Sequence, residues 1–277
     1  MTLLAVQRLG VGAVPPDEPV LHADDEGFLR GRAVFETLRV YGGRPFRLEA
    51  HLERLRRSAE TLGLPEPDLG ALAQAGLDAV AGGGSPDAVL RFLWTPGREG
   101  SGRPTGLALV STLPPDLEER RARGFRVAVV RWAPGHRLAA TKSTSYAENL
   151  AAQDEAHARG CDDALLVDAD DVVLEAPTAN VWFREGRRLL TPALAQPILA
   201  GVTRAALWEL AGEAGYEPSE GVYPLAQVAA ADEVFLSSSV RAVMPVVELD
   251  GARVGDGRPG EAALALQQAL RRAAEGR

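Results

Sequence analysis

The sequence predicts a two-domain protein of the α+β class, with a small N-terminal α/β domain over residues 1–114 and a larger C-terminal domain over residues 115–277. A length of 277 residues is enough for two domains, and 46% hydrophobic with 25% charged residues is an ordinary globular composition. Both halves contain strand-like and helix-like segments. Between them, the tandem prolines of Leu113-Pro114-Pro115-Asp116 form a stiff, non-helical spacer.

Composition excludes several classes of function. The net charge of −8 argues against a nucleic-acid partner, because a phosphate backbone needs clustered cations. No apolar run approaches 18 residues and no signal-peptide pattern is visible, so we expect no membrane segment and a cytoplasmic location. The one cysteine, Cys161, rules out an intrachain disulfide and fits a reducing compartment.

The first domain is expected to alternate strands and helices. A short strand around Leu3–Val6 precedes a longer one over Val34–Tyr41, which ends in the Gly42-Gly43 hairpin turn. A helix closing at Gly63 follows, because apolar residues step by four, three, four and three through Leu48, Leu52, Leu55, Ala59 and Leu62. A second helix over 68–81 and strands at 88–94 and 106–112 complete the domain.

The second domain is expected to open with a short helix and a buried strand over Phe125–Arg131. A helix over Ser145–Arg159 and two hairpins come next. The expected hairpin strands are 164–167 with 172–174, and 181–184 with 188–190. A helix after Gly201 continues to Ala214, a strand covers 233–236, and a helix ends the chain.

Lys142 is the only lysine in a chain whose other cations are all arginine. Arginine can neither form an imine nor lose its proton near neutral pH, whereas lysine can do both. A Schiff-base lysine and a surface lysine in an arginine-rich chain are both compatible with this observation.

The neighbouring residues resemble those of the fold-type IV pyridoxal-phosphate (PLP) enzymes. The relevant stretches are Lys142-Ser-Thr-Ser-Tyr146-Ala-Glu-Asn149 and Glu175-Ala-Pro-Thr-Ala-Asn180. That family includes D-amino-acid and branched-chain aminotransferases and aminodeoxychorismate lyases. The resemblance implies two domains, the larger with a β-barrel-like core. It also implies that Lys142 holds PLP as a Schiff base and that Glu175 contacts the pyridine nitrogen, keeping the ring protonated as an electron sink.

The first domain carries a second part of the resemblance. Phe35-Glu36-Thr37-x-Arg39-Val40 and His51-x-x-Arg54-Leu55 are similar to the small-domain signature of the family. Spacing alone makes Arg54 a solvated helix cation, whereas the resemblance implies that its fork binds the cofactor phosphate. Substrate-side positions are implied for Phe35, Thr37 and Tyr146. Arg32-Ala33 departs from the acidic residue and glycine of many relatives, which affects the local pocket.

The remaining cofactor contacts are expected at two turns. Gly201-Val202-Thr203 precedes a helix whose N-terminus can bind an anion, although a simple N-cap gives the same pattern. Ser238 and Ser239 follow a strand, which is typical of an ordinary turn. The family places phosphate-binding groups at both positions, and Asn180 is expected to join the cofactor-binding residues.

The sequence leaves the reaction class open. Glu155-Ala-His157-x-x-Gly160 resembles the D-amino-acid aminotransferases, whereas Ser239-Val-Arg241-Ala-Val-Met-Pro resembles the lyases. An aminotransferase acting on amino and keto acids is the preferred interpretation, with aminodeoxychorismate lyase as the alternative and a non-catalytic PLP-binding protein as a third class. The resemblance also implies a homodimer.

A substrate carboxylate needs a cation. With Lys142 committed to the cofactor, Arg98 and Arg241 are the candidates. The histidines show no metal-ligand spacing with the cysteine, and no Gly-x-Ser-x-Gly nucleophile motif occurs, so no metal is expected. The histidines are His22, His51, His136 and His157.

Overall fold

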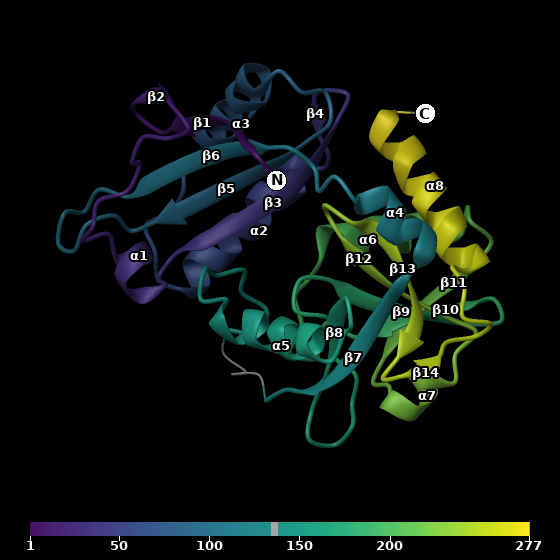
Figure 1. Ribbon diagram of the computed structural model, residues 1–277. Coiled ribbons are helices and arrows are strands. Elements are labelled where there is room, and N and C mark those ends of the chain that lie inside the picture. The colour runs from purple at the N-terminus through teal and green to yellow at the C-terminus, as the bar shows by residue number, and fades with distance from the viewer. Residues whose placement is uncertain (134–137, 277) are drawn as a thin grey trace. The chain divides into compact units, whose positions relative to one another are not determined.

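The computed structural model describes residues 1–133 and 138–276 and divides into two compact units (Figure 1). The N-terminal unit comprises Met1–Pro115 together with Thr141–Tyr146, and the C-terminal unit is formed by the other residues from Asp116 onward. The chain leaves the first unit within the expected proline spacer. Thr141–Tyr146 was expected in the second domain. It belongs to the first unit instead, because its backbone pairs with a strand of that unit.

A six-stranded antiparallel sheet forms the centre of the N-terminal unit, in the order β2-β1-β6-β5-β3-β4. Its strands are β1 Leu3–Arg8, β2 Gly12–Val14, β3 Val34–Tyr41, β4 Arg44–Pro45, β5 Ala88–Thr95 and β6 Thr105–Ser111. The four strands that the sequence predicts in this unit are confirmed, with small shifts at their ends. The other two, β2 and β4, are too short to leave a pattern of alternation.

Helices α2 (Leu48–Thr61) and α3 (Leu69–Gly83) pack on one face of this sheet, and both were expected. Their core contains Leu38, Leu55 and Phe92, each fully buried. Gly63 takes a positive φ of 61° just past the end of α2, a conformation that glycine adopts without strain. The short helix α1 (Glu26–Arg30) was not predicted, because it has no buried residue and therefore no apolar periodicity in the sequence.

The C-terminal unit is built on an eight-stranded mixed sheet in the order β11-β10-β9-β12-β13-β7-β8, with β14 on β13. The strands are β7 Phe125–Arg131, β8 Asp163–Val167, β9 Asn180–Glu185, β10 Arg188–Pro192, β11 Glu217–Gly221, β12 Glu233–Ser238, β13 Ala242–Leu249 and β14 Ala252–Arg253. Single bridges from Val167 to Val173 and from Val172 to Pro224 continue from β8 toward the end of β11. The sheet therefore curls toward a barrel, and the expected α+β fold class is confirmed.

One expected strand of this unit is irregular, and strands β11, β13 and β14 were not expected. Val172–Leu174 pairs with β8 as the expected hairpin partner, because the Leu174 N–H donates to the Leu166 carbonyl at 2.9 Å and the Asp168 N–H donates to the Val172 carbonyl at 3.0 Å, but it forms single bridges and not a regular strand. Strand β13 was not expected, because a proline inside a strand argues against that assignment. Pro245 nevertheless lies within β13, opposite Phe235 on β12.

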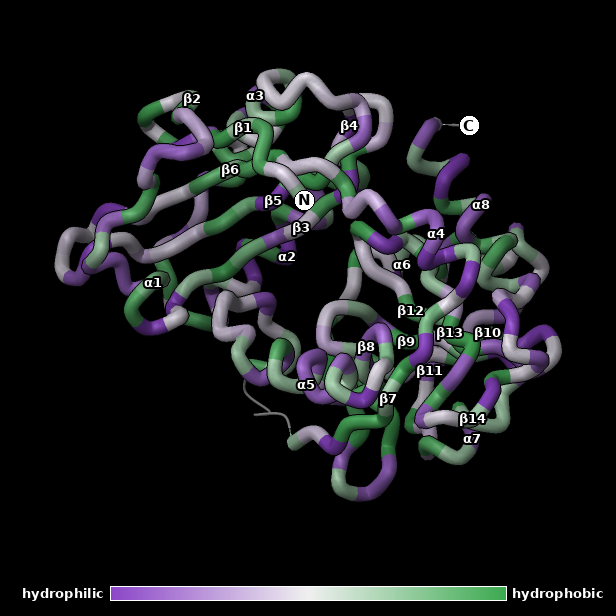
Figure 2. The backbone as a smooth tube through the Cα atoms, in the orientation of Figure 1, coloured by the Kyte–Doolittle hydropathy of each residue, from purple (hydrophilic) through white to green (hydrophobic). Residues whose placement is uncertain are grey.

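Five helices cover parts of the C-terminal sheet. They are α4 Leu117–Arg123, α5 Ala147–Ala158, α6 Val202–Leu210, α7 Leu225–Ala229 and α8 Glu261–Glu275. Helix α5 packs on β7 and β8 through Ala152 and Ala156, while α6 and α8 pack on β12 and β13. Helix α6 ends at Leu210, one turn before the expected Ala214. The hydrophobic residues, green in Figure 2, gather on the strands of both sheets.

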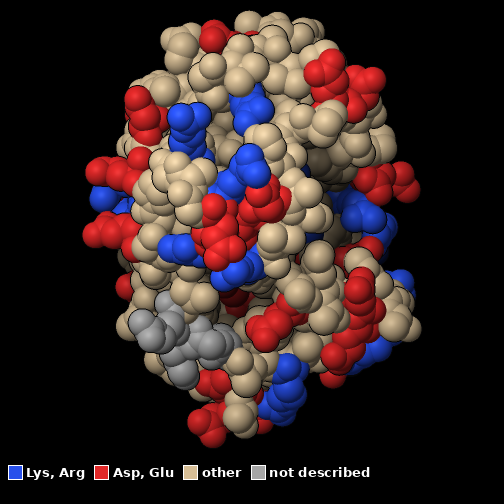
Figure 3. Space-filling view, turned by 90° about the vertical axis from the view of Figure 1, so that its left-hand side faces the viewer, with Lys and Arg blue, Asp and Glu red and all other residues tan. Residues whose placement is uncertain are grey.

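Surface charges are mixed in sign. Acidic and basic side chains are interspersed on the face that Figure 3 shows. On α2, for example, Arg56 pairs with both Glu53 and Glu60. In the part of the chain that the structure describes, none of the helices has the length and apolar character needed to cross a membrane.

Replacing Leu55 tests the core of the N-terminal unit. Leu55 is fully buried between α2 and the sheet, so Leu55→Ala should lower the free energy of unfolding by about 2–5 kcal/mol. Urea titration of the purified proteins measures this change. Leu77→Ala on α3 is the matched control, because Leu77 is 44% exposed and its truncation should cost much less. Equal losses in the two variants would contradict the assigned core.

Candidate active site

Lys142 is held in the N-terminal unit by main-chain pairing with the start of β3. The Phe35 N–H donates to the Lys142 carbonyl at 3.1 Å, and the Thr144 N–H donates to the Ala33 carbonyl at 2.9 Å. The Lys142 N–H donates in turn to the Ser58 hydroxyl of α2 at 3.2 Å. The backbone of the lysine is therefore tied both to the strand and to the helix.

The amine of Lys142 lies beside two aromatic rings. Its Nζ is 4.5 Å from the centre of the Phe35 ring and 5.8 Å from that of Tyr146. The two rings pack edge to face with their centres 5.2 Å apart. Such faces attract a cation, so they hold the ammonium in a defined place. Phe35 and Tyr146, both expected on the substrate side, thus lie with Lys142.

Arg54 forms a buried ion pair with Glu36 on the neighbouring strand β3. Its Nε and Nη2 donate to the two carboxylate oxygens, each at 2.7 Å, and both residues are at most 5% exposed. Burial by itself raises the pKa of Glu36, but the charge and hydrogen bonds of Arg54 and a hydrogen bond from His51 outweigh it and lower this pKa to about 2. Arg54 is thus not a solvated helix cation, and its role at the cofactor phosphate stays a prediction.

His51 completes this cluster. Its Nδ1 lies 2.7 Å from Glu36 Oε2. Burial is the main reason that the pKa of His51 is lowered, the cations Arg54 and Lys142 add to it, and the Glu36 carboxylate opposes it. The ring is therefore neutral near pH 7, and because a carboxylate only accepts, Nδ1 donates to Glu36. In the sequence, His51, Arg54 and Glu36 were all marked by the small-domain signature of the family.

Glu175 and Asn180 belong to the C-terminal unit and contact each other. The Asn180 Nδ2 donates to Glu175 Oε2 at 3.0 Å and to the Leu199 carbonyl at 2.9 Å. The Leu199 N–H donates to both Glu175 oxygens, at 3.1 and 3.2 Å. Two donors thus fix the orientation of the carboxylate. No pattern in the sequence pointed to Leu199, because its contribution is a backbone group.

The Gly201–Thr203 turn begins helix α6, and its N-terminus has no side-chain cap. A Cβ at Gly201 would come 1.9 Å from the Asn180 side-chain oxygen, so only glycine fits beside that residue. The first N–H groups of α6, at Val202 and Thr203, keep the anion-binding character of a helix N-terminus. The expected phosphate cradle at these backbone groups stays a prediction.

The serine run lies at the end of β12. Ser237 is buried and its hydroxyl accepts from the Trp182 indole at 3.1 Å, whereas Ser238 and Ser239 are half-buried. Ser238 and Ser239, whose hydroxyls are expected at the cofactor phosphate, are thus more accessible than Ser237.

Both arginines expected to bind a substrate carboxylate have partners within the protein. Arg98 pairs with Asp24 at 2.9 Å on the surface. Arg241 pairs with the buried Asp163 and also donates to the Thr178 hydroxyl at 3.2 Å. Spacing in the sequence gave no indication of Asp24 or Asp163, which lie 74 and 78 residues from their arginines.

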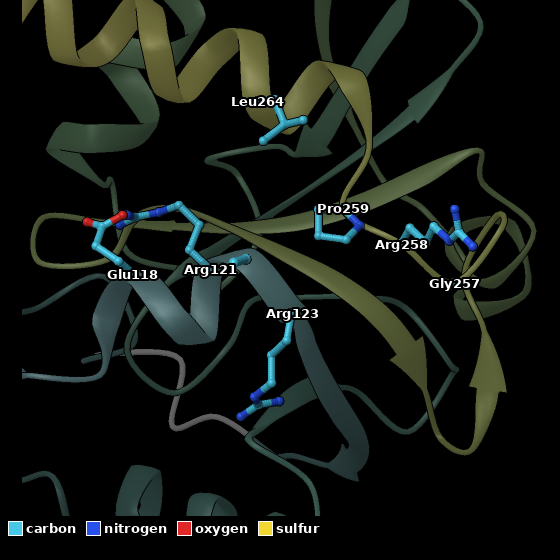
Figure 4. A pocket seen from close by; sticks show the side chains of 8 residues that line it. Glu118, Arg121, Arg123, Gly257, Arg258, Pro259 and Leu264 are labelled. Carbon is cyan, nitrogen blue, oxygen red and sulfur yellow. The ribbon is translucent and has the colours of Figure 1, made fainter.

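A surface hollow between α4 and residues 257–264 contains none of the expected site residues (Figure 4). Arg121 lies against Glu118, while Arg123 and Arg258 point elsewhere. Because these cations do not converge, the hollow is not an anion site. Among the described residues no cluster of His, Cys, Asp and Glu could hold a metal ion, and His136 falls outside them.

Residues 33–249 match the class IV aminotransferase family. The chain belongs to this family. It is 35% identical over 257 residues to a bifunctional aminodeoxychorismate lyase / D-amino acid transaminase of Mycobacterium tuberculosis, covering 86% of this chain and 89% of that one. The matched range includes Arg54, Lys142, Glu175 and Thr203.

Two solved structures support the membership. A fold IV transaminase from Curtobacterium pusillum matches with a TM-score of 0.86 and 34% identity, over 94% of this chain and 96% of that one. A hypothetical aminotransferase from Mycobacterium tuberculosis, bound to alpha-ketoglutarate and PMP, matches with a TM-score of 0.91 and 33% identity, over 99% and 100%. The latter protein was also solved in a PLP-bound form.

Replacing Glu36 should remove a pH dependence of stability. Because its pKa falls from the ordinary 4.5 to about 2 on folding, its ionised form stabilises the protein above pH 4.5, and this contribution is lost as the pH falls toward 2. The full loss is on the order of 3 kcal/mol. Glu36→Gln should therefore lower the free energy of unfolding at pH 6 and lessen its decline between pH 6 and pH 3.

Urea unfolding at the two pH values measures this effect. Glu53→Gln on the exposed side of α2 is the control, and it should retain the wild-type decline, since water screens its ion pair. If the free energy of unfolding of Glu36→Gln declined between pH 6 and pH 3 as much as that of the wild type, the lowered pKa of Glu36 would be refuted.

Proposed function

We propose that this protein is a PLP-dependent aminotransferase that transfers an amino group from an amino acid of the D or branched-chain type to a 2-oxo acid. The observation that carries the proposal is the placement of the single lysine, whose amine lies against Phe35 and Tyr146 on a backbone paired with β3. Family membership and the PLP- and PMP-bound neighbours support the same reaction.

The residues of each unit fit this cofactor. In the C-terminal unit, the uncapped N-terminus of α6 and the Ser238 and Ser239 hydroxyls suit a phosphate, and the Glu175 carboxylate suits a pyridine nitrogen. In the N-terminal unit, Lys142 supplies the amine and Arg54 a cation. Bound PLP supplies an aldehyde carbon for that amine and a ring that stores the electron pair released from the substrate.

The protein groups then have distinct tasks. The Lys142 Nζ would take the proton from the substrate α-carbon and deliver it to the exocyclic carbon of the bound cofactor, and in the second half-reaction it would move a proton in the opposite direction. The Glu175 carboxylate holds a proton at the ring nitrogen, oriented by Asn180 and the Leu199 N–H. The rings of Phe35 and Tyr146 keep water from one side of the amine.

For the substrate carboxylate we propose Arg91 as a further candidate beside Arg98 and Arg241. Phe35, Thr37 and Arg39 alternate onto the sheet face opposite α2 and α3, and Arg91 on β5 lies directly across from Thr37. Its Nε donates to the Thr37 hydroxyl at 3.4 Å, and the side chain is exposed. Along β3, Thr37 is about 7 Å beyond Phe35, on the same face of the sheet. This spacing supports a carboxylate contact at Arg91 for a substrate whose amino group lies at Lys142.

Aminodeoxychorismate lyase is the second candidate, because one relative bears both activities in its name. Both reactions begin with the same proton abstraction, so the residues around Lys142 serve either. A homodimer and a cytoplasmic location complete the proposal as predictions from the family resemblance.

Incubation with a panel of D- and branched L-amino acids, with 2-oxoglutarate or pyruvate as acceptor, tests the function. A keto acid should form only with an acceptor and should be absent with Lys142→Ala. Borohydride reduction followed by peptide mass spectrometry should place the cofactor label on Lys142. Formation of 4-aminobenzoate and pyruvate from aminodeoxychorismate without an acceptor, together with no transamination, would replace the aminotransferase with the lyase.

Removal of the Arg91 guanidinium should weaken substrate binding. A charge-assisted hydrogen bond contributes about 1.5–3 kcal/mol, so Arg91→Gln should raise the KM for the 2-oxo acid roughly tenfold to a hundredfold, with PLP affinity unchanged. Arg57→Gln, an exposed cation on α2, is the matched control and should leave the KM as it is. Steady-state kinetics that show equal KM values for the two variants would exclude Arg91.

A further inference from the structure

Glu175 and Asn180 flank one tight turn. The Ala176 N–H donates to the Ala179 carbonyl at 2.8 Å, and the Ala179 N–H donates back to the Ala176 carbonyl at 3.3 Å. The carboxylate and its orienting amide are therefore attached to the two ends of the same small loop. Any shift of that loop moves both side chains.

Two side chains from other elements hold this turn in place. The Asn149 Nδ2 of α5 donates to the Pro177 carbonyl at 2.9 Å. The Arg241 Nη2, from the connection between β12 and β13, donates to the Thr178 hydroxyl at 3.2 Å. The second contact is charge-assisted and thus the stronger kind of hydrogen bond.

Arg241 is itself firmly held. Its Nη1 donates to Asp163, which is fully buried, and its guanidinium lies 5.4 Å from the centre of the Phe125 ring. Asp163 is oriented by Gln153 of α5, whose amide donates to it at 3.1 Å. The Arg241 carbonyl accepts from Arg121 at 2.8 Å. Both the side chain and the backbone of Arg241 are restrained.

We propose that Arg241 is a positioning residue that sets the separation between Glu175 and the Ser238–Ser239 hydroxyls. Arg241 follows Ser239 by two residues, and its guanidinium donates to Thr178 in the turn between Glu175 and Asn180. One residue therefore connects the serine segment with that turn. The cofactor is a rigid ring with its phosphate at a set distance from the ring nitrogen. The two contacts must therefore be held in register, and a small error in such a constellation has a large cost. This inference rests on the proposed function.

Thr178→Val tests the link without disturbing the Arg241–Asp163 pair, because valine keeps the shape and loses only the acceptor. We expect the Kd for PLP to rise about tenfold and kcat to fall about tenfold, with the KM for the amino donor unchanged. The ¹⁵N NMR signal of ¹⁵N-labelled PLP should shift, because the ring nitrogen loses its aligned partner. Thr178→Ser retains the hydroxyl and should restore all of these values.

Arg241→Lys should behave like Thr178→Val, because an ammonium that pairs with Asp163 lacks the second arm that reaches Thr178. Arg123→Met is the matched control, since the half-exposed Arg123 pairs with Asp162 and not with Asp163 or Thr178. It should leave the Kd and the ¹⁵N signal at wild-type values.

The outcomes separate this inference from the proposed function. If the wild-type protein fails to bind PLP, the proposed function itself is refuted. If it binds PLP but Thr178→Val has the wild-type Kd and ¹⁵N signal, only the positioning role is overturned. A lowered unfolding temperature of the cofactor-free Thr178→Val protein without any change in the ¹⁵N signal would likewise reduce the contact to a structural one.

Discussion

Main-chain pairing between Thr141–Tyr146 and the start of β3 is the constraint on which the placement of Lys142 depends. The Phe35 N–H donates to the Lys142 carbonyl and the Thr144 N–H donates to the Ala33 carbonyl, and the Ser58 hydroxyl accepts from the Lys142 N–H. Val34, between the paired residues, is fully buried in the core of the N-terminal unit. The lysine is therefore anchored to the sheet, although it is far from β3 in the sequence.

Strand β3 serves two purposes because its residues alternate between the faces of the sheet. Phe35 and Thr37 point to one face, where the ring meets Lys142, and Glu36 points to the other, where it pairs with Arg54 and His51. A buried ion pair seldom adds much net stability, since removing both charges from water costs about as much as their attraction returns. Once both charges are buried, however, neither can be lost without cost, and the bidentate contact also sets the plane of the Arg54 guanidinium.

The C-terminal unit orients its polar groups in the same manner. Glu175 already accepts hydrogen bonds from Asn180 and Leu199, Gly201 lies against Asn180, and Arg241 holds the turn next to them. Groups that are held before a ligand arrives need little reorganisation when it binds, which is the basis of electrostatic preorganisation. The network draws on α5, β8 and the connection after β12, so it is a property of the unit and not of one motif.

The sequence by itself determined the main helices and strands, because their signals are local. The leucine spacing of α2 and the alternation in β3 depend only on residues a few positions apart. It also singled out Lys142 and Glu175, through an isolated lysine and a family motif. It did not reveal β11, β13 or β14, and β13 contains Pro245, a residue that argues against a strand. Nor did it reveal that Thr141–Tyr146 belongs to the first unit.

Only the tertiary structure decided the partners of the charged residues. The contacts of Arg54 with Glu36, Arg98 with Asp24 and Arg241 with Asp163 join residues 18, 74 and 78 positions apart. An arginine has the same appearance in a sequence whether it binds a substrate, a cofactor or a buried aspartate. Which of these it does depends on the carboxylate that the fold brings within 3 Å or so of its guanidinium, and no local pattern of residues records that distance.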